Sequence, residues 1–370
     1  MSDVERRNDE EEVMAGSKNR LNRRDVLRGF GIGVMGVALG GRVFKPGISR
    51  AAVGPAKAGL RRGRLYQKVT EPARVSLVKG NDRREIVYQS LKKIEDEILA
   101  SIGDKKILIK PNMVQVNTPL CATHVDAIRA ILDFLKPHYK REIIVGESTA
   151  ARTSTFNGFK NYGYMPLEKE YNVKLVDLNK DTYEYRYVFG KGHRPQPIRI
   201  ISTFLDRDLY IISAARMKTH DRVVATLSLK NVLLGAPLND YKNNDKWLTH
   251  SEYTFSRKAV LHYNMFHLAQ EIYPDLGVID GFEAMEGNGP VGGTPVDAQV
   301  ALASVDPLAL DVLAIKIMGF DPGKLMYLTA LAEAGMGQGD LDKIKVLGTP
   351  LQQCQYHFKP HNRMVEPYNL

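Results

Sequence analysis

Apolar residues follow two alternating patterns along the chain. Short apolar runs, typical of buried strands, occupy residues 74–79, 106–110, 142–146, 173–178, 208–213, 276–280 and 299–303. Apolar residues three or four positions apart, typical of amphipathic helices, predict helices near 86–98, 123–135, 157–171, 257–273 and 306–318. We expect Thr123 and Asp306 to act as N-caps of two of these helices.

The alternation of strands with helices predicts the fold class. It indicates an α/β domain whose mostly parallel sheet is covered by helices on both faces. Residues 183–201 lack the helical pattern and predict a β insertion. We see no internal repeat and expect a single domain.

The N-terminal region has a different pattern. Arg23 and Arg24 are followed by a polar residue, two apolar residues and Arg28, as in twin-arginine export signals, and residues 29–41 form a glycine-rich, weakly apolar run. That run is too short for a membrane span, which needs about 20 apolar residues. The alternative is an amphipathic helix with a chance arginine pair.

This pattern divides the chain into four segments. We expect a twin-arginine signal peptide over 1–58, a linker over 59–70, the α/β domain over 71–348 and a C-terminal tail over 349–370. The expected partner is the twin-arginine translocase, and the expected location is periplasmic or otherwise extracytoplasmic. An uncleaved leader would leave the protein associated with the membrane.

Charge and cysteine content narrow the function classes. The formal net charge is +10, but no run of five or more Lys or Arg occurs, so no nucleic-acid partner is expected. The chain has only two cysteines, Cys121 and Cys354, and cannot by itself supply the ligands of an iron–sulfur cluster. They form either a disulfide or two separate buried thiols.

Candidate ligand-binding residues follow the predicted strands, where ligands collect in open parallel sheets. Lys110 and Asn112 follow the strand 106–110, and Lys218, Thr219 and His220 follow the strand 208–213. Lysines at such a place can hold a carboxylate or phosphate, and a histidine can carry protons or bind a metal. The alternative is a set of solvated or structural polar groups.

A second polar pair interrupts an apolar stretch over 223–234. Lys230 and Asn231 lie within it, and a lysine among apolar residues is unfavourable unless it is paired. Lys218, His220 and Lys230 are therefore the candidate catalytic residues. Asn231 joins the candidate ligand-binding group.

Carboxylates follow the strand 276–280. Asp280, Glu283 and Glu286 precede a glycine-rich segment that contains Gly287 and Gly289, where backbone can approach a ligand closely. Grouped carboxylates bind hard cations. Together with Asp311, which adjoins apolar residues, these three acids are the candidate metal ligands; the alternative is a solvated acidic loop.

Taken together, these motifs resemble the DUF362 family (domain of unknown function 362). The residues that carry the resemblance are Lys110-Pro111-Asn112, Met217-Lys218-Thr219-His220, Thr226, Leu229-Lys230-Asn231, Asp280-Gly281, Glu286-Gly287-Asn288-Gly289-Pro290, Gly293 and Ser304 to Asp311. Many members of that family carry ferredoxin-type cysteines, which this chain lacks. The resemblance therefore implies no iron–sulfur cluster here, whereas a divalent metal is compatible with the candidate ligands.

Two function classes remain open. One is an enzyme or redox-accessory protein that uses a metal held by the carboxylates. The other is a non-catalytic protein that binds a small anionic molecule through the lysines. In both cases we expect the lysines, His220 and Asn231 to face the four carboxylates across one cleft.

Overall fold

The computed structural model describes residues 68–250 and 258–368. Its strands are β1 (Ala73–Lys79), β2 (Lys106–Pro111), β3 (Ile143–Glu147), β4 (Val173–Asp177), β5 (Tyr183–Phe189), β6 (Pro195–Ile201), β7 (Leu209–His220), β8 (Val224–Thr226), β9 (Leu276–Glu286), β10 (Thr294–Ser304) and β11 (Ile344–Gly348). Its helices are α3 (Arg83–Lys92), α4 (Glu95–Ile102), α5 (Val125–Leu135), α6 (Thr155–Asn161), α7 (Leu167–Glu170), α8 (Ser228–Leu233), α9 (Asp245–His250), α10 (Lys258–Ala269), α11 (Pro307–Ile317), α12 (Met326–Glu333) and α13 (Val365–Tyr368). The predicted leader and most of the predicted linker lie outside the described residues.

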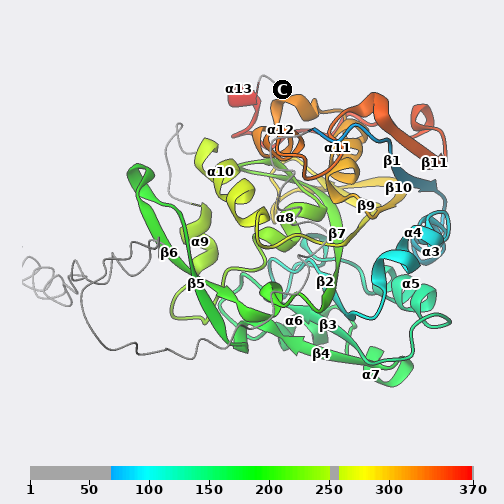
Figure 1. Cartoon of the computed structure of the whole chain (residues 1–370), viewed down its shortest axis with the longest axis horizontal. Coiled ribbons are helices and arrows are strands. Elements are labelled where there is room, and N and C mark those ends of the chain that lie inside the picture. The colour runs from blue at the N-terminus through cyan, green and yellow to red at the C-terminus, as the bar shows by residue number, and fades with distance from the viewer. Residues whose placement is uncertain (1–67, 251–257, 369–370) are drawn as a thin grey trace, which may run out of the picture. The chain divides into compact units, whose positions relative to one another are not determined.

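One sheet organises the described part of the chain (Figure 1). Its strand order is β11-β1-β10-β9-β7-β2-β3-β4, with β8 paired to β7. Pairing is parallel from β9 through β7, β2 and β3 to β4 and between β1 and β11, whereas β10 runs antiparallel to both of its neighbours. The predicted mostly parallel α/β fold is confirmed.

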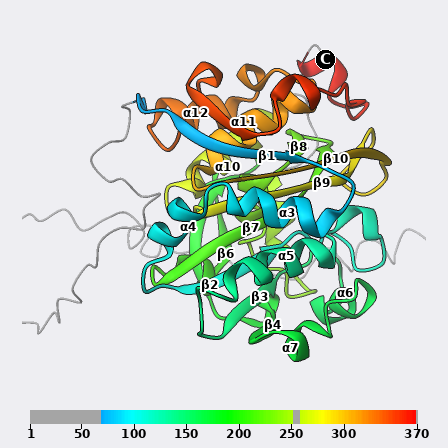
Figure 2. The same ribbon diagram turned by 90° about the vertical axis from the view of Figure 1, so that its right-hand side faces the viewer.

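The two faces of the sheet bury two separate apolar cores. Along β2, Leu108 packs into the core that contains α8 and α11, whereas Ile107 and Ile109 pack into the core that contains α3 and α5. This alternation follows from the strand geometry, in which successive side chains point to opposite faces. Figure 2 shows α3 and α5 side by side on one face.

The strands β7 and β9 are longer than the sequence predicts. The structure extends them to His220 and Glu286, so residues expected in loops after the strands lie on the strands themselves. Charged residues interrupt the apolar pattern after residue 213, which is why the prediction ended there. All twelve residues of β7 are nevertheless buried.

Of the two predicted helix caps, one is confirmed and the other is wrong. Asp306 caps α11, because its Oδ1 accepts hydrogen bonds from the backbone N–H groups of Leu308 and Ala309. The N-cap of α5 is His124, not Thr123. The Thr123 hydroxyl instead links the backbone of two strands, since it accepts from Asn112 N and donates to Ala214 O.

Three other expectations have a structural outcome. The predicted β insertion is the antiparallel hairpin β5–β6. Cys121 and Cys354 are both buried free thiols, so they do not pair. Within the described ranges, no helix is long and apolar enough to cross a membrane.

Candidate functional site

A pocket of about 270 Å³ opens at the carboxyl ends of β2, β3 and β7. Helices α8 and α9 and the segment after β9 complete its wall. Five of the predicted site residues line it, namely Lys110, Asn112, His220, Lys230 and Asn231. The sequence therefore identified the correct strand ends for β2 and β7, as the strand-end rule requires.

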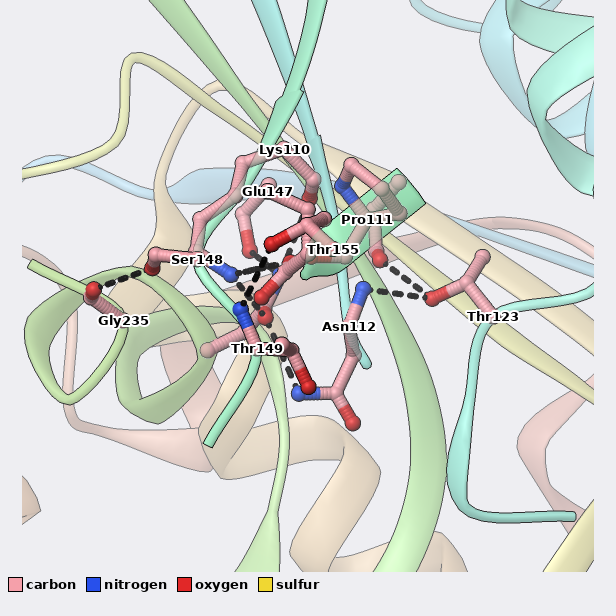
Figure 3. Close-up of polar contacts among 12 residues, drawn as sticks. Lys110, Pro111, Asn112, Thr123, Glu147, Ser148, Thr149, Thr155 and Gly235 are labelled. Carbon is pink, nitrogen blue, oxygen red and sulfur yellow. Dashed lines mark hydrogen bonds and ion pairs between the residues drawn. The ribbon is translucent and has the colours of Figure 1, made fainter. Parts of the chain in front are cut away.

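Lys110 is fixed at the inner wall of the pocket. Its ammonium donates to Glu147 Oε2 at 2.7 Å and to Pro111 O at 2.9 Å (Figure 3). It also donates to Asn231 Oδ1 at 3.1 Å. Burial lowers the pKa of Lys110, and the Glu147 carboxylate opposes that shift. All three hydrogens of the ammonium are used, so Lys110 orders the site.

Asn231 connects the helix α8 to the sheet. Its amide nitrogen donates to Lys110 O and to Ser213 Oγ, both at 3.1 Å, and its oxygen also accepts from Asn112 Nδ2 at 3.1 Å. The Asn112 side-chain oxygen is buried and has no hydrogen-bond partner among residues 68–250 and 258–368. An unsatisfied buried acceptor beside a pocket is available to a ligand donor.

Lys246 is a pocket residue that the sequence analysis missed. It lies on α9, and its ammonium donates to Ser148 Oγ at 3.1 Å, Gly235 O at 2.6 Å and Pro237 O at 2.7 Å. Burial lowers its pKa to about 7. Three acceptors satisfy this ammonium without any ligand.

Lys230 differs from the other pocket lysines. Only 7% of it is exposed, yet its ammonium has no hydrogen-bond or ion-pair partner among the described residues. Burial, and then the nearby charge of Lys218, lower its pKa to about 7. The hydroxyl of Thr226, also in the pocket wall, is buried and has no partner in the part of the chain that the structure describes.

Two neutral histidines stack beside the pocket, with ring centroids 5.9 Å apart. His220 Nδ1 accepts from the Arg222 backbone N–H at 3.1 Å, which assigns its proton to Nε2. His250 Nδ1 lies 2.6 Å from Lys246 O and must donate to that carbonyl, so its Nε2 carries a lone pair. Burial lowers the pKa of both rings, that of His250 to about 3. His250 was not among the predicted site residues.

Two predicted site residues of β7 lie outside the pocket. Lys218 is buried and donates to Cys121 O at 2.7 Å, and burial lowers its pKa to about 8. Thr219 Oγ1 donates to Gly287 O at 2.9 Å. Both side chains hold segments of the fold together instead of lining the pocket.

The four candidate metal ligands do not share the pocket, which corrects the expected single cleft. Asp280 lies 3.3 Å from Arg83 Nε, on the face of the sheet that α3 covers, opposite the face on which Lys110 meets α8. Glu283 pairs with Arg216 at 3.3 Å, and Glu286 accepts from Lys359 N at 2.8 Å.

Asp311, the fourth carboxylate, accepts hydrogen bonds from the first residues of α8. It accepts from Ser228 N at 2.9 Å and from Leu229 N at 3.0 Å. Burial raises its pKa to about 8, and these two hydrogen bonds oppose the shift. Within residues 68–250 and 258–368, no three His, Cys, Asp or Glu side chains are placed to hold one metal ion.

The glycine-rich segment after β9 reaches the pocket through Pro290 and Val291. Gly289 packs against β7 so closely that a Cβ there would lie 2.1 Å from Thr219 O. Gly287 has a positive φ of 72°, and its N–H donates to Lys359 O at 2.7 Å. Gly289 therefore shapes the wall by close backbone packing, whereas Gly287 supplies a backbone conformation with positive φ.

Glu147 is another residue that the sequence analysis missed. It ends β3 directly after an apolar run, the same signal that selected Lys110, and it could have been found on that ground. Arg222, which lines the pocket and donates to His250 O at 3.1 Å, carries no such signal.

A family model described as a domain of unknown function, DUF362, matches residues 107–316. The chain belongs to the DUF362 family. The DUF362 match spans β2 to α11 and so includes every predicted site residue. The resemblance drawn from the motifs is confirmed.

Two further proteins are similar to part of this DUF362 chain. The thylakoid-associated protein sll1697 of Synechocystis sp. is 25% identical over 236 residues, which are 63% of this chain and 69% of that protein. A crystal structure of a Thermotoga maritima protein aligns with a TM-score of 0.34 and 11% identity over 59% of this chain. The aligned part is 55% of that protein, so the chain spans about half its length.

Proposed function

We propose that the pocket binds a small anionic ligand. The observation that carries the proposal is Lys230, whose buried side-chain nitrogen lies in the pocket with no partner in the described residues. A buried charge is unfavourable unless it is paired, and a ligand carboxylate or phosphate would supply the pair. The pocket wall holds four cationic side chains, Lys110, Lys230, Lys246 and Arg222, against the carboxylates Glu147 and Asp221.

Two unsatisfied groups refine the ligand class. Asn112 Oδ1 needs a donor, and the Thr226 hydroxyl can donate to an oxygen. The ligand therefore combines an anionic group with a hydroxyl or amine. The volume of about 270 Å³ is near the lower end of small-molecule sites, which favours a compact metabolite.

The competing class, an enzyme that uses a metal held by the four carboxylates, has less support. Asp280 and Asp311 each have their own protein partners on opposite faces of the sheet. Metal analysis of the protein purified from cells that export it tests this class directly. Stoichiometric metal that is lost in Asp280→Asn would favour it over anion binding.

Calorimetric and thermal-shift titrations with phosphate, sulfate, citrate and lactate at constant ionic strength test anion binding. We expect at least one anion to raise the melting temperature of the wild type, because binding to the folded state alone stabilises it. Lys230→Met should abolish that shift. Lys345→Met removes an exposed lysine from β11 and should leave it unchanged. An equal response in the wild type and Lys230→Met would refute the proposal.

We also propose that the protein is exported by the twin-arginine route to the periplasm or another extracytoplasmic site. The support is Arg23 and Arg24 with the glycine-rich run after them. Replacing both arginines with lysine should retain the protein in the cytoplasm; unchanged export would contradict the proposal.

A further inference from the structure

Lys230 and Lys246 line the same pocket and are both buried, but their nitrogen atoms have different surroundings. The Lys246 nitrogen faces three oxygen acceptors at 2.6 to 3.1 Å. The Lys230 nitrogen faces none among the described residues. The Lys246 nitrogen therefore already donates to protein acceptors, whereas the Lys230 nitrogen can interact with a ligand.

This difference decides which nitrogen can act as a nucleophile. A neutral amine attacks through its lone pair, and an ammonium has none. At Lys246 the three acceptors require three N–H donors, which favours the ammonium. At Lys230 no acceptor among the described residues takes the third hydrogen. Burial and the charge of Lys218 disfavour the ammonium more than the nearby Asp221 carboxylate favours it.

We propose that Lys230 forms an imine with the carbonyl group of a small aldehyde acid or keto acid held in the pocket. This rests on the proposed anion binding and adds a covalent step to it. The positive field of the pocket holds the carboxylate of the ligand, and the unpartnered Lys230 nitrogen meets its carbonyl carbon.

The step balances without an oxidant or reductant. The Lys230 nitrogen forms a bond to the carbonyl carbon and the carbonyl π pair moves to oxygen; the oxygen takes up a proton and the nitrogen loses one, which gives a carbinolamine. The hydroxyl then takes up a second proton and leaves as water while the C=N bond forms, and the nitrogen loses its remaining proton. One amine and one carbonyl give one imine and one water.

The two histidines supply the proton groups that this step needs. His220 presents an N–H at Nε2 for the carbonyl oxygen, and His250 presents a lone pair at Nε2 that can accept the proton from nitrogen. Both rings lie near enough to Lys230 for its charge to lower their pKa. Their opposite tautomers therefore give one donor and one acceptor beside the same amine.

Reductive trapping tests the inference. The full-length protein is incubated at pH 7 with glyoxylate and cyanoborohydride, which converts an imine into a stable secondary amine, and the labelled lysines are located by peptide mass mapping. We expect Lys230 to be labelled at least about tenfold faster than any exposed lysine, because lysines in water are protonated almost completely at this pH. It should also be labelled faster than Lys246, whose nitrogen donates to three acceptors. Lys345→Met, at an exposed position on β11, should keep the label at Lys230, and Lys230→Met should lose it.

The outcomes separate this inference from the proposed function. If anions bind by calorimetry but Lys230 is labelled no faster than exposed lysines, the imine is refuted and anion binding stands. If Lys230 is labelled and an anion without a carbonyl slows the labelling, both hold. If neither anion binding nor preferential labelling occurs in the wild type, both fail. The wild-type measurement decides even if a variant does not fold.

Discussion

Lys110 Nζ lies 2.7 Å from Glu147 Oε2, and both side chains are almost completely enclosed. The pair joins the ends of β2 and β3 and forms the inner wall of the pocket. Removing one member of a buried pair leaves an uncompensated charge. The pair is therefore part of the architecture that holds the pocket open, and the neighbouring Lys230 is left free for a ligand.

The first prediction follows from this pair. Glu147→Ala should lower the free energy of unfolding by about 3–5 kcal/mol, because the Lys110 ammonium keeps its burial and loses its carboxylate. Glu147→Gln should lower it less, since an amide oxygen still accepts. Urea unfolding measures both. As a control, Glu170→Gln breaks the largely exposed pair with Arg129 and should change the value by no more than about 1 kcal/mol; equal losses would contradict the interpretation.

The pH dependence of stability supplies the second prediction. Burial lowers the pKa of Lys218 to about 8 in the folded state, below its usual value near 10.5. Between these two values the unfolded chain binds more protons, so this residue makes the protein more stable as the pH rises from about 8 to about 10.5.

Lys218→Met should remove this contribution. The difference in unfolding free energy between wild type and variant should change by about 3 kcal/mol across that range, at 1.36 kcal/mol per pKa unit. Urea unfolding at several pH values between 7.5 and 10.5 measures it. Lys345→Met, which alters an exposed lysine, should show no such slope. A wild-type curve parallel to that of Lys218→Met would disprove the assignment.

The sequence predicted the sheet well because its signal is local. Apolar runs such as 106–110 mark strands, and the rule that ligands gather at strand ends selected Lys110. Lys230 was selected because it interrupts an apolar stretch. The partner of Lys110 was missed because Glu147 is 37 residues away. That pairing depends on the parallel register of β2 against β3, which no local pattern encodes.

The predicted metal site was misplaced for a geometric reason. Asp280, Glu283 and Glu286 are three residues apart, a spacing that brings side chains together on a helix or in a loop. The structure instead places them on β9, where Asp280 and Glu283 both contact Arg83, at 3.3 and 3.9 Å. Glu286, at the end of the strand, accepts from Lys359 N. Protein groups, and above all an arginine, therefore hold these carboxylates.

The third prediction concerns Asp311, expected as a metal ligand and found at the start of α8. Asp311→Ala should lower the free energy of unfolding by about 2–5 kcal/mol, because the N–H groups of Ser228 and Leu229 would be buried without an acceptor. Since α8 carries Lys230, the anion-induced rise in melting temperature should also fall. Chemical denaturation tests the first effect. The exposed cap variant Asp321→Ala, which frees only Gly323 N, should lose about 1 kcal/mol or less.

The last prediction concerns the packing of the glycine-rich segment against β7. A Cβ at Gly289 would lie 2.1 Å from the backbone oxygen of Thr219, which belongs to the buried strand β7. Gly289→Ala should therefore displace Pro290 and Val291 from the pocket wall and weaken anion binding at least about tenfold by calorimetry. Gly292 lies in the same segment, where the nearest atom to a Cβ would be 3.4 Å away, so Gly292→Ala introduces the same methyl group with little displacement. The two variants differ only in where the methyl group falls, and equal affinities would show that this segment does not shape the ligand site.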